Sequence, residues 1–222
     1  IIQRCEPVFP FQHGWLGADG DVSVAISPTT TLFFFSDTYV GTKNQVSRKA
    51  PGMKMVSNSV AVETCTPHGT DVRYYWNEMF KEHPQPMFDS YTDRYRFWLN
   101  DAFVVNKNLY VLLEKIGSKQ GAAPDDLFNF SLLGFTLAKI SNYTEPPDTW
   151  QVELKALPVV KNPEMGIRCC VPFDGYVYFF VSRDHDKIQS LLRKKMDGFD
   201  EREQAFEYYA LNKTWKTCRM PE

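Results

Sequence analysis

The sequence lacks several features that would place it quickly in a functional class. It has no uninterrupted apolar run of roughly 18 residues, the minimum for a membrane-spanning helix. An excess of positive charge is also missing, because 25 lysines and arginines against 27 aspartates and glutamates give a net charge of −2. No phosphate-binding loop, dinucleotide fingerprint or G-x-S-x-G nucleophile turn occurs. We therefore expect no membrane span and no nucleic-acid partner. The oligomeric state is left open.

Metal-ligand spacing is absent as well. None of the five cysteines forms a C-x-x-C pair, and the four histidines are isolated from one another. We therefore predict no metal site and no cofactor. The adjacent residues Cys169 and Cys170 should point to opposite faces of a strand, and we expect one of them to be a small buried residue.

Aromatic residues are abundant where helical patterns are scarce. Phenylalanine, tyrosine and tryptophan make up 15% of the chain, alongside 14 prolines, a mixture that favours strands and turns. Short apolar and aromatic segments alternate with turn residues along most of the sequence. This pattern predicts an all-β fold, either a sandwich or a propeller.

An internal repeat favours the propeller over the sandwich. Three stretches share a layout of four strands with a tight first hairpin, at about 19–80, 95–160 and 164–216. The expected strands are 21–26, 31–35, 55–64 and 71–76 in the first stretch, 101–105, 109–113, 132–140 and 150–156 in the second, and 167–171, 176–180, 191–195 and 205–209 in the third. This repeat predicts a β-propeller of four-stranded antiparallel blades, with a sandwich of twelve strands as the alternative. Three blades cannot close a ring, so we expect 1–222 to be a single propeller domain that is incomplete at its C-terminus.

Acidic residues recur at one corner of each expected blade. In an antiparallel blade, the start of the first strand and the end of the second share one end, where a site could be built. Two carboxyl groups facing a sugar are the usual minimum for cleaving a glycosidic bond, and a third can raise the pKa of the acid. The predicted catalytic residues are Asp19, Asp101 and Glu164. The alternative for each aspartate is a turn former.

Other polar and aromatic residues near the same corners are predicted to bind the substrate. This set consists of Asp21, Asp37, Asn58, Trp15, Trp98 and Glu114. The indoles are candidate stacking surfaces for a sugar ring, or else they pack in the core between blades. Asp37 either lines the cleft or bonds the backbone of its own turn, and Glu114 has the same two alternatives.

The opening of the sequence carries a resemblance. The segments 14–20 (GWLGADG) and 32–41 (LFFFSDTYVG), with Asn58-Ser59 after them, resemble a group of propeller domains similar to five-bladed glycoside hydrolases of the arabinanase, β-xylosidase and levansucrase type. The resemblance implies five blades, of which three are visible here. It also implies that Asp19 is the base or nucleophile, with Asp21 in reserve. Asp101 would tune a pKa or stabilise the transition state, and Glu164 would be the acid.

The compartment and the activity remain expectations. Three N-glycosylation sequons begin at Asn129, Asn142 and Asn212, and the chain starts at Ile1 rather than methionine, which together favour a secreted or extracytoplasmic glycoprotein. The leading hypothesis is a glycoside-hydrolase-like propeller that acts on a carbohydrate. The alternative is a non-catalytic propeller that binds a glycan or a protein.

Overall fold

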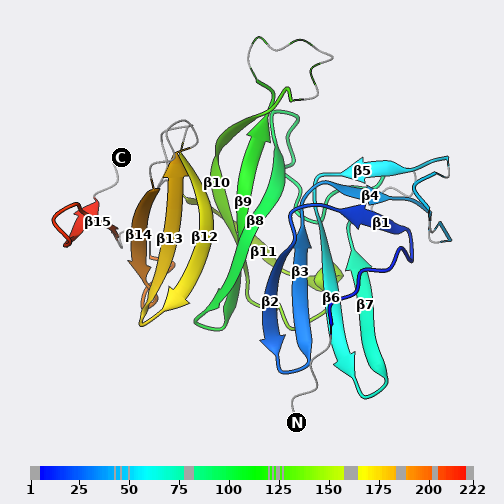
Figure 1. The fold of residues 1–222 in the computed structure, drawn as a ribbon, viewed down its shortest axis with the longest axis horizontal. Coiled ribbons are helices and arrows are strands. Elements are labelled where there is room, and N and C mark those ends of the chain that lie inside the picture. Colours follow the sequence, from blue (N-terminus) through cyan, green and yellow to red (C-terminus); the bar gives the residue numbers. More distant parts are fainter. Residues whose placement is uncertain are drawn as a thin grey trace. The chain divides into compact units, whose positions relative to one another are not determined.

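The computed structural model describes residues 6–218, apart from 43, 46, 50, 78–82, 120, 122, 124–125, 127, 158–164, 184–188 and 202–204. These residues form sixteen strands in four antiparallel sheets, with one 3-10 turn, η1 (Pro147–Thr149), and no α-helix (Figure 1). Within this described part, no helix has the length and apolar character needed to cross a membrane. The predicted all-β fold class is therefore confirmed.

The chain divides into two compact units. Unit 1 comprises 1–99 and 142–150, and unit 2 comprises 100–141 and 151–222. Each unit contains two of the four sheets, and strand β8 (Arg96–Val105) crosses the boundary between the units.

Unit 1 contains a large and a small sheet. The large sheet has the order β2-β3-β6-β7, with strands β2 (Val22–Ser27), β3 (Thr30–Phe35), β6 (Ser59–Thr66) and β7 (Gly69–Tyr75). The small sheet has the order β1-β4-β5, with strands β1 (Trp15–Ala18), β4 (Thr38–Val40) and β5 (Lys54–Val56). The large sheet has the strand order expected of the first repeat. The expected single strand 55–64 is wrong, because it is divided between β5 and β6 in different sheets.

Aromatic side chains build the core of unit 1. Phe33 and Phe35 alternate on one face of β3 and meet Trp15 from β1, together with Ala61 and Val72. The Phe9 ring closes this cluster, with ring centroids 4.9 Å from Phe33 and 5.3 Å from Phe35. Leu32 and Phe34, which point to the opposite face of β3, are buried as well, so both faces of this strand are covered.

The first sheet of unit 2 follows the expected second repeat. Its order is β11-β10-β9-β8, with strands β8, β9 (Asn108–Gly117), β10 (Ser131–Ile140) and β11 (Val152–Leu157). The hairpin turn at Asn106 and Lys107 places both residues at positive φ, 49° and 60°. Such a turn matches the twist of the flanking strands. Each strand expected in this repeat is present, although β8 begins five residues before and β9 ends four residues after the expected bounds.

The second sheet of unit 2 is one strand wider than expected. Its order is β12-β13-β14-β15-β16, with strands β12 (Met165–Phe173), β13 (Tyr176–Arg183), β14 (Gln189–Lys195), β15 (Phe206–Tyr209) and β16 (Trp215–Cys218). The last strand was not predicted, because the expected repeat has four strands and ends with 205–209. A turn at 210–214 pairs it with β15.

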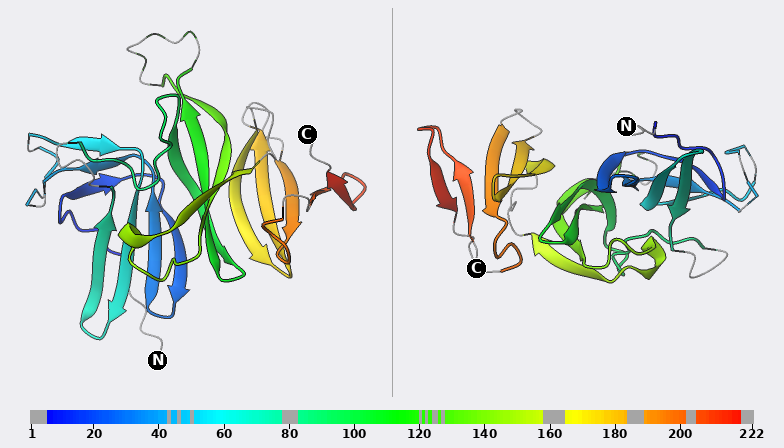
Figure 2. Two further views of the ribbon diagram at one scale, coloured as in Figure 1. Left: turned by 180° about the vertical axis from the view of Figure 1, so that it is seen from behind. Right: turned by 90° about the horizontal axis from the view of Figure 1, so that it is seen from below.

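The two sheets of unit 2 share one hydrophobic core. From the first sheet it takes Phe103, Tyr110, Leu112, Phe135 and Leu137, and from the second Ile167, Cys170, Val177, Phe179 and Phe206. Figure 2 shows these sheets layered in the second view. Cys170 is buried in this core while Cys169 is partly exposed, and both thiols are free. The expectation that one of the adjacent cysteines is a small buried residue is confirmed.

Candidate functional site

Three strands of unit 1 run from the large sheet into the small sheet. Residues 15–27 contain β1 and β2, residues 30–40 contain β3 and β4, and residues 54–66 contain β5 and β6. In the large sheet β3 pairs with β2 and β6, and in the small sheet β4 pairs with β1 and β5. Neighbouring strands therefore change sheets at the same level, as Figure 1 shows.

We call this line of bends the crease, and it consists of residues 19–21, 36–37 and 57–58. Two backbone hydrogen bonds keep the first two strands paired through it, from the Asp19 N–H to the Asp37 carbonyl (3.2 Å) and from the Ser36 N–H to the Asp19 carbonyl (2.9 Å). Gly20 has φ of 66°, and a Cβ there would lie 2.9 Å from Ser36 Oγ. Glycine is therefore required where the strands bend.

The crease brings two predicted carboxyl groups together. Burial raises the pKa of the Asp19 carboxyl above its ordinary value, and the negative charge of Asp37 raises it further. Hydrogen bonds from backbone N–H groups act in the opposite direction but are weaker. Burial also raises the pKa of Asp21. The crease therefore holds a carboxyl that retains its proton to a higher pH than a free aspartate would.

Trp98 fixes the orientation of one of these carboxylates. Its indole Nε1 donates a hydrogen bond of 2.8 Å to Asp37 Oδ1. The Arg96 guanidinium lies 5.3 Å from the centre of the indole ring, and Trp98 itself is half-buried. The Arg96 guanidinium, the Trp98 indole and the Asp37 carboxylate therefore contact one another in that order, next to Asp19.

Asn58, on the third strand of the crease, is fully buried. Its Nδ2 donates to the carbonyls of Phe88 and Phe97 at 3.0 Å each, and its Oδ1 accepts from the Phe88 N–H at 2.7 Å. Ser36 makes a similar connection, since its Oγ both donates to and accepts from the Leu99 backbone at 3.0 Å. The inner side of the crease therefore binds the protein's own backbone.

Trp15 lies in the core of unit 1. Its indole is 3% exposed and stacks on the Tyr74 ring, with centroids 4.3 Å apart and planes 6° from parallel. This place corresponds to the core-packing alternative left open by the sequence. Little of the ring surface is accessible to a ligand.

In unit 2, Asp101 bonds to backbone through both carboxylate oxygens. Oδ1 accepts the Ala102 N–H at 2.8 Å, and Oδ2 accepts the Cys170 N–H, which ties β8 to β12. Burial raises the pKa of Asp101 despite these hydrogen bonds, and its charge helps to raise the pKa of both neighbouring thiols. Glu114 Oε1 accepts a hydrogen bond of 2.7 Å from Asn100 Nδ2.

Glu164, the predicted acid, lies outside the described residues. In the part of the chain that is described, no group of three or more histidine, cysteine or acidic residues is arranged to hold a metal ion.

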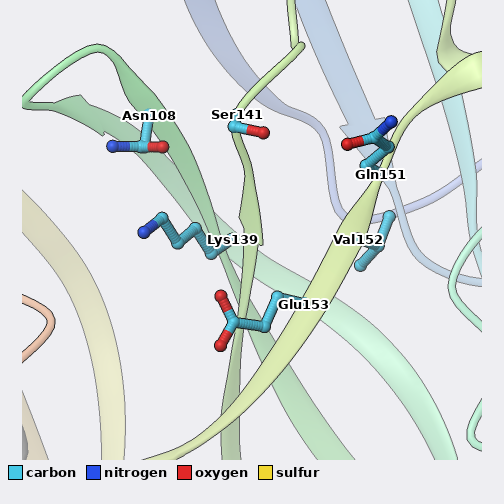
Figure 3. A pocket seen from close by; sticks show the side chains of 6 residues that line it. All are labelled: Asn108, Lys139, Ser141, Gln151, Val152 and Glu153. Carbon is cyan, nitrogen blue, oxygen red and sulfur yellow. The ribbon is translucent and has the colours of Figure 1, made fainter.

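A polar pocket of about 360 Å³ opens elsewhere in unit 2. It is lined by Asn108, Lys139, Ser141, Gln151, Val152 and Glu153 (Figure 3). Lys139 and Glu153 are directly paired across β10 and β11, and the figure shows both projecting from the same side of the sheet.

Asp200 holds the lysine of this pocket in place. Its carboxylate forms ion pairs with Lys139 and Lys155 and accepts a hydrogen bond from the Tyr110 hydroxyl at 2.9 Å. These three partners outweigh the effect of burial and lower the pKa of Asp200. Sequence reasoning missed this cluster, because Lys139 and Asp200 are 61 residues apart and no local pattern connects them. Arg96 was also missed, although it lies two residues before Trp98 and so on the same strand face.

Comparisons with known proteins give a family and a fold. Residues 6–220 match the model of a domain of unknown function (DUF5005). No curated protein matches the chain. Among solved structures, the chain is similar to one described as a putative hydrolase from Bacteroides ovatus, with a TM-score of 0.64 and 17% identity. The match covers 95% of this chain and 56% of that one, so this chain spans little more than half the length of that protein.

Proposed function

This chain belongs to the DUF5005 family, and we propose that it is part of a β-propeller that acts on a carbohydrate at the crease of unit 1. The observation that carries the proposal is the hydrogen bond between Trp98 and Asp37 beside the carboxyl of Asp19. The Trp98 indole offers an aromatic surface for a sugar ring, and the carboxyl groups of Asp37 and Asp19 lie next to it in different environments.

The sheet order supports the propeller. The sheets β2-β3-β6-β7, β8-β9-β10-β11 and β12-β13-β14-β15 each connect neighbouring strands in an up-and-down order, as propeller blades do. In unit 2, two successive sheets share a core of large apolar side chains, which is how neighbouring blades pack. We propose five blades, three of them in this chain.

The chemistry of the crease fits acid-base catalysis. Glycoside cleavage needs one carboxyl that holds a proton and one that is ionised. The raised pKa of Asp19 favours its protonated form, and the neighbouring charge of Asp37 contributes to that rise. The indole of Trp98 keeps Asp37 in one orientation, so the pair is preorganised.

The remaining predicted residues take supporting roles in the proposal. Asp101 uses both oxygens on backbone N–H groups, so we assign it to positioning β8 and β12. Glu114 is oriented by Asn100. The sequence-based hypothesis made Glu164 the acid and Asp19 the base; because the pKa of Asp19 is raised, we propose Asp19 as the proton-holding carboxyl at the crease and keep Glu164 in the test panel as the alternative acid.

One observation favours a second function, which is glycan binding without cleavage. Both carboxylate oxygens of Asp101 accept hydrogen bonds from backbone N–H groups, so one of the three carboxyl groups predicted to be catalytic has a structural role instead. In that case the indole of Trp98 and the carboxylate of Asp37 would recognise a sugar ring and its hydroxyls.

A paired screen for hydrolysis and binding tests both functions. The chain is incubated with aryl-glycosides and polysaccharides, and glycan affinity is measured in parallel for Asp19→Asn, Asp37→Asn, Trp98→Phe and Glu164→Gln. The matched control is Asp71→Asn, an exposed aspartate on β7 that forms an ion pair with Arg73 on its own strand. Loss of an acid-base group should lower turnover by about 100-fold or more, while the control keeps it.

The outcomes separate the hypotheses. Turnover that Asp19→Asn abolishes and Asp71→Asn preserves would support the hydrolase. Binding without turnover, weakened in Trp98→Phe and Asp37→Asn, would support the binding module. If the chain neither binds nor cleaves any glycan of the panel, the hypothesis of a carbohydrate ligand at the crease is refuted.

We also propose that the protein is secreted or extracytoplasmic. Cys65 is disulfide-bonded, and such bonds persist in oxidising compartments. Of the three sequons, the one at Asn212 lies on the exposed β15–β16 turn, where Thr214 Oγ1 bonds Asn212 Oδ1 at 2.7 Å. Mass spectrometry of the protein isolated from its native source tests this compartment: a disulfide at Cys65 or a glycan on a sequon would support it, and a free Cys65 thiol without any glycan would contradict it.

A further inference from the structure

Positive charge is concentrated in one stretch of unit 1. Residues 38–62 contain no aspartate or glutamate. The four cationic residues of this stretch are Lys43, Arg48, Lys49 and Lys54. The net charge of the whole chain is −2, and subtracting the +4 of this stretch leaves −6 for the rest. The stretch is therefore a basic segment in an otherwise acidic chain.

This stretch contains a hairpin that continues directly from the crease. We call the hairpin the basic arm, and it consists of β4, β5 and the described residues of the loop between them, which are 41–42, 44–45, 47–49 and 51–53. Strand β4 begins directly after Asp37, β5 ends directly before Ser57, and Figure 1 shows the two strands side by side. At about 3.3 Å per residue, the arm begins within about 10 Å of the crease. A polymer bound at the crease can therefore reach the arm.

The loop of the basic arm is held in place by Gln45, which is 7% exposed. Its backbone N–H donates to the Thr42 carbonyl at 2.8 Å, and its Nε2 donates to the Ser47 carbonyl at 3.1 Å. Gly41 leaves the space that the buried amide occupies, since a Cβ there would collide with it. The loop is thus ordered before any ligand binds, which lowers the cost of binding.

Arg48 lies flat against the small sheet. Its guanidinium is 5.0 Å from the Tyr39 ring centre and 5.3 Å from the Phe11 ring centre. Its Nε donates to the Leu16 carbonyl at 2.5 Å, and a Cβ at Gly17 would collide with the guanidinium. All of these partners are uncharged, so they orient the cation without neutralising it.

The charges of the basic arm face solvent. Arg48, Lys49 and Lys54 are exposed, and within the described part of the chain no carboxylate forms an ion pair with them. Phe11 is 43% exposed and Met55 is 56% exposed, so apolar surface lies beside the cations. A single lysine on an edge strand prevents pairing with another edge, but that purpose does not require an arm without any acidic residue.

We propose that the basic arm binds the carboxylate or sulfate groups of an acidic polysaccharide whose neighbouring units occupy the crease. The inference rests on the proposed function in taking the ligand to be a carbohydrate, and it narrows that ligand to a charged class. A guanidinium can hold a carboxylate or a sulfate through two parallel hydrogen bonds, and lysines add attraction. Phe11 and Met55 offer apolar surface to the sugar rings.

The distribution of charge also orients the polysaccharide. The crease holds Asp19, Asp21 and Asp37, which repel an acidic unit, so a neutral unit belongs at the crease and the acidic units belong at the arm. Exposed charges attract one another over only about 8–10 Å at physiological ionic strength. We therefore expect the affinity for the acidic polysaccharide to fall as salt is added.

Titration calorimetry with two matched pairs of polysaccharides tests the proposal. The pairs are polygalacturonate with its methyl ester, and dextran sulfate with dextran, so each pair keeps one backbone and removes the charge. The arm variant combines Lys49→Gln with Lys54→Gln. The control combines Lys195→Gln with Lys216→Gln, which removes the same charge from exposed positions of unit 2. The arm variant should bind the acidic polysaccharide about 3- to 10-fold more weakly at low salt, because two exposed ion pairs are lost.

The results separate this inference from the proposed function. Support requires that an acidic polysaccharide binds about tenfold or more tightly than its neutral counterpart and that only the arm variant weakens it. Equal affinity within each pair, or equal losses in the arm variant and the control, would overturn the role of the arm and leave the crease as a carbohydrate site. No binding of any polysaccharide would overturn both.

Two further probes test whether the arm is selective for carbohydrate. A duplex DNA oligonucleotide and phosphatidylserine vesicles are titrated under the same conditions. Binding of either probe as tightly as the acidic polysaccharide would show a general attraction for polyanions and would overturn the proposal. Far-UV circular dichroism of each variant confirms that it is folded before its affinity is compared.

Discussion

Replacing Asn58 with alanine should destabilise the protein strongly, although the residue was predicted from the sequence to bind substrate. Its side chain is 0% exposed and makes three hydrogen bonds to backbone groups, which are the Phe88 carbonyl, the Phe97 carbonyl and the Phe88 N–H. Alanine would leave all three backbone groups buried without this partner. Each such group costs about 1–3 kcal/mol, so the expected loss is about 3–5 kcal/mol once water relieves part of it.

Such a loss is a large share of the free energy of unfolding, which is typically about 5–15 kcal/mol. For a chain of this size it corresponds to a fall of roughly 6–20 °C in the melting temperature. Chemical denaturation followed by tryptophan fluorescence and by far-UV circular dichroism measures the change. The control is Asn212→Ala, an exposed asparagine on the β15–β16 turn, which should change stability by less than about 0.5 kcal/mol.

The test distinguishes a structural residue from a ligand-binding residue. A loss below about 1 kcal/mol, combined with weaker glycan binding, would refute the reasoning, since the amide would then be available to a ligand instead of to the backbone.

Three further changes follow from the same structure. Gly20→Ala should cost about 1–3 kcal/mol, because its Cβ would lie 2.9 Å from Ser36 Oγ, whereas Gly52→Ala, also at positive φ but with nothing within 4 Å, should cost less in the same melting assay. Asp200→Asn should lower the free energy of unfolding by about 1 kcal/mol at pH 7 and by little near pH 2. The pKa of Asp200 in the folded protein lies below the ordinary value, so the carboxylate stabilises the fold above the ordinary pKa and this contribution disappears as the pH falls through the folded pKa. Chemical denaturation at several pH values measures the change. Arg193→Lys should lower the free energy of unfolding, measured by urea denaturation, by about 1–2 kcal/mol. The Arg193 guanidinium stacks on the Tyr176 and Trp215 rings while its Nε donates to Glu207, and an ammonium cannot keep all three contacts. An unchanged midpoint in any of these assays would contradict the contact on which it rests.

Much of the strand layout could be predicted from the sequence. Hairpins such as β2–β3 and β12–β13 carry their signal locally, as alternating aromatic and β-branched residues on either side of a short turn. The pairing of β9 with β10 also followed, although the connection between them is long.

The small sheet of unit 1 could not be predicted from the sequence. Its strands β4 and β5 have three residues each, which is too few to show a period of two. The segment 55–64 looks like one strand in the sequence, and only the packing around Asn58 divides it. The local pattern of a strand does not show which sheet it joins.

The candidate site was predicted in part. Asp19 and Asp37 do lie close together at the crease, because both residues come at the ends of strands whose pairing is set by a short hairpin. The burial of Trp15 and Asn58 depends on Tyr74 and on Phe88, and their distance in the sequence hides such contacts. Residue type alone does not separate an aromatic that stacks on a sugar from one that stacks in the core.

The crease also bears on how unit 1 loses its structure. Strands of three residues with few neighbours would fray in isolation. In unit 1, however, the polypeptide of each small-sheet strand continues into a long strand of the large sheet. Opening the small sheet therefore pulls on the large one, and the two should behave as a single cooperative folding unit in native-state hydrogen exchange. Amides of β4 should then exchange at rates close to those of β3, much more slowly than their short ladder alone would allow.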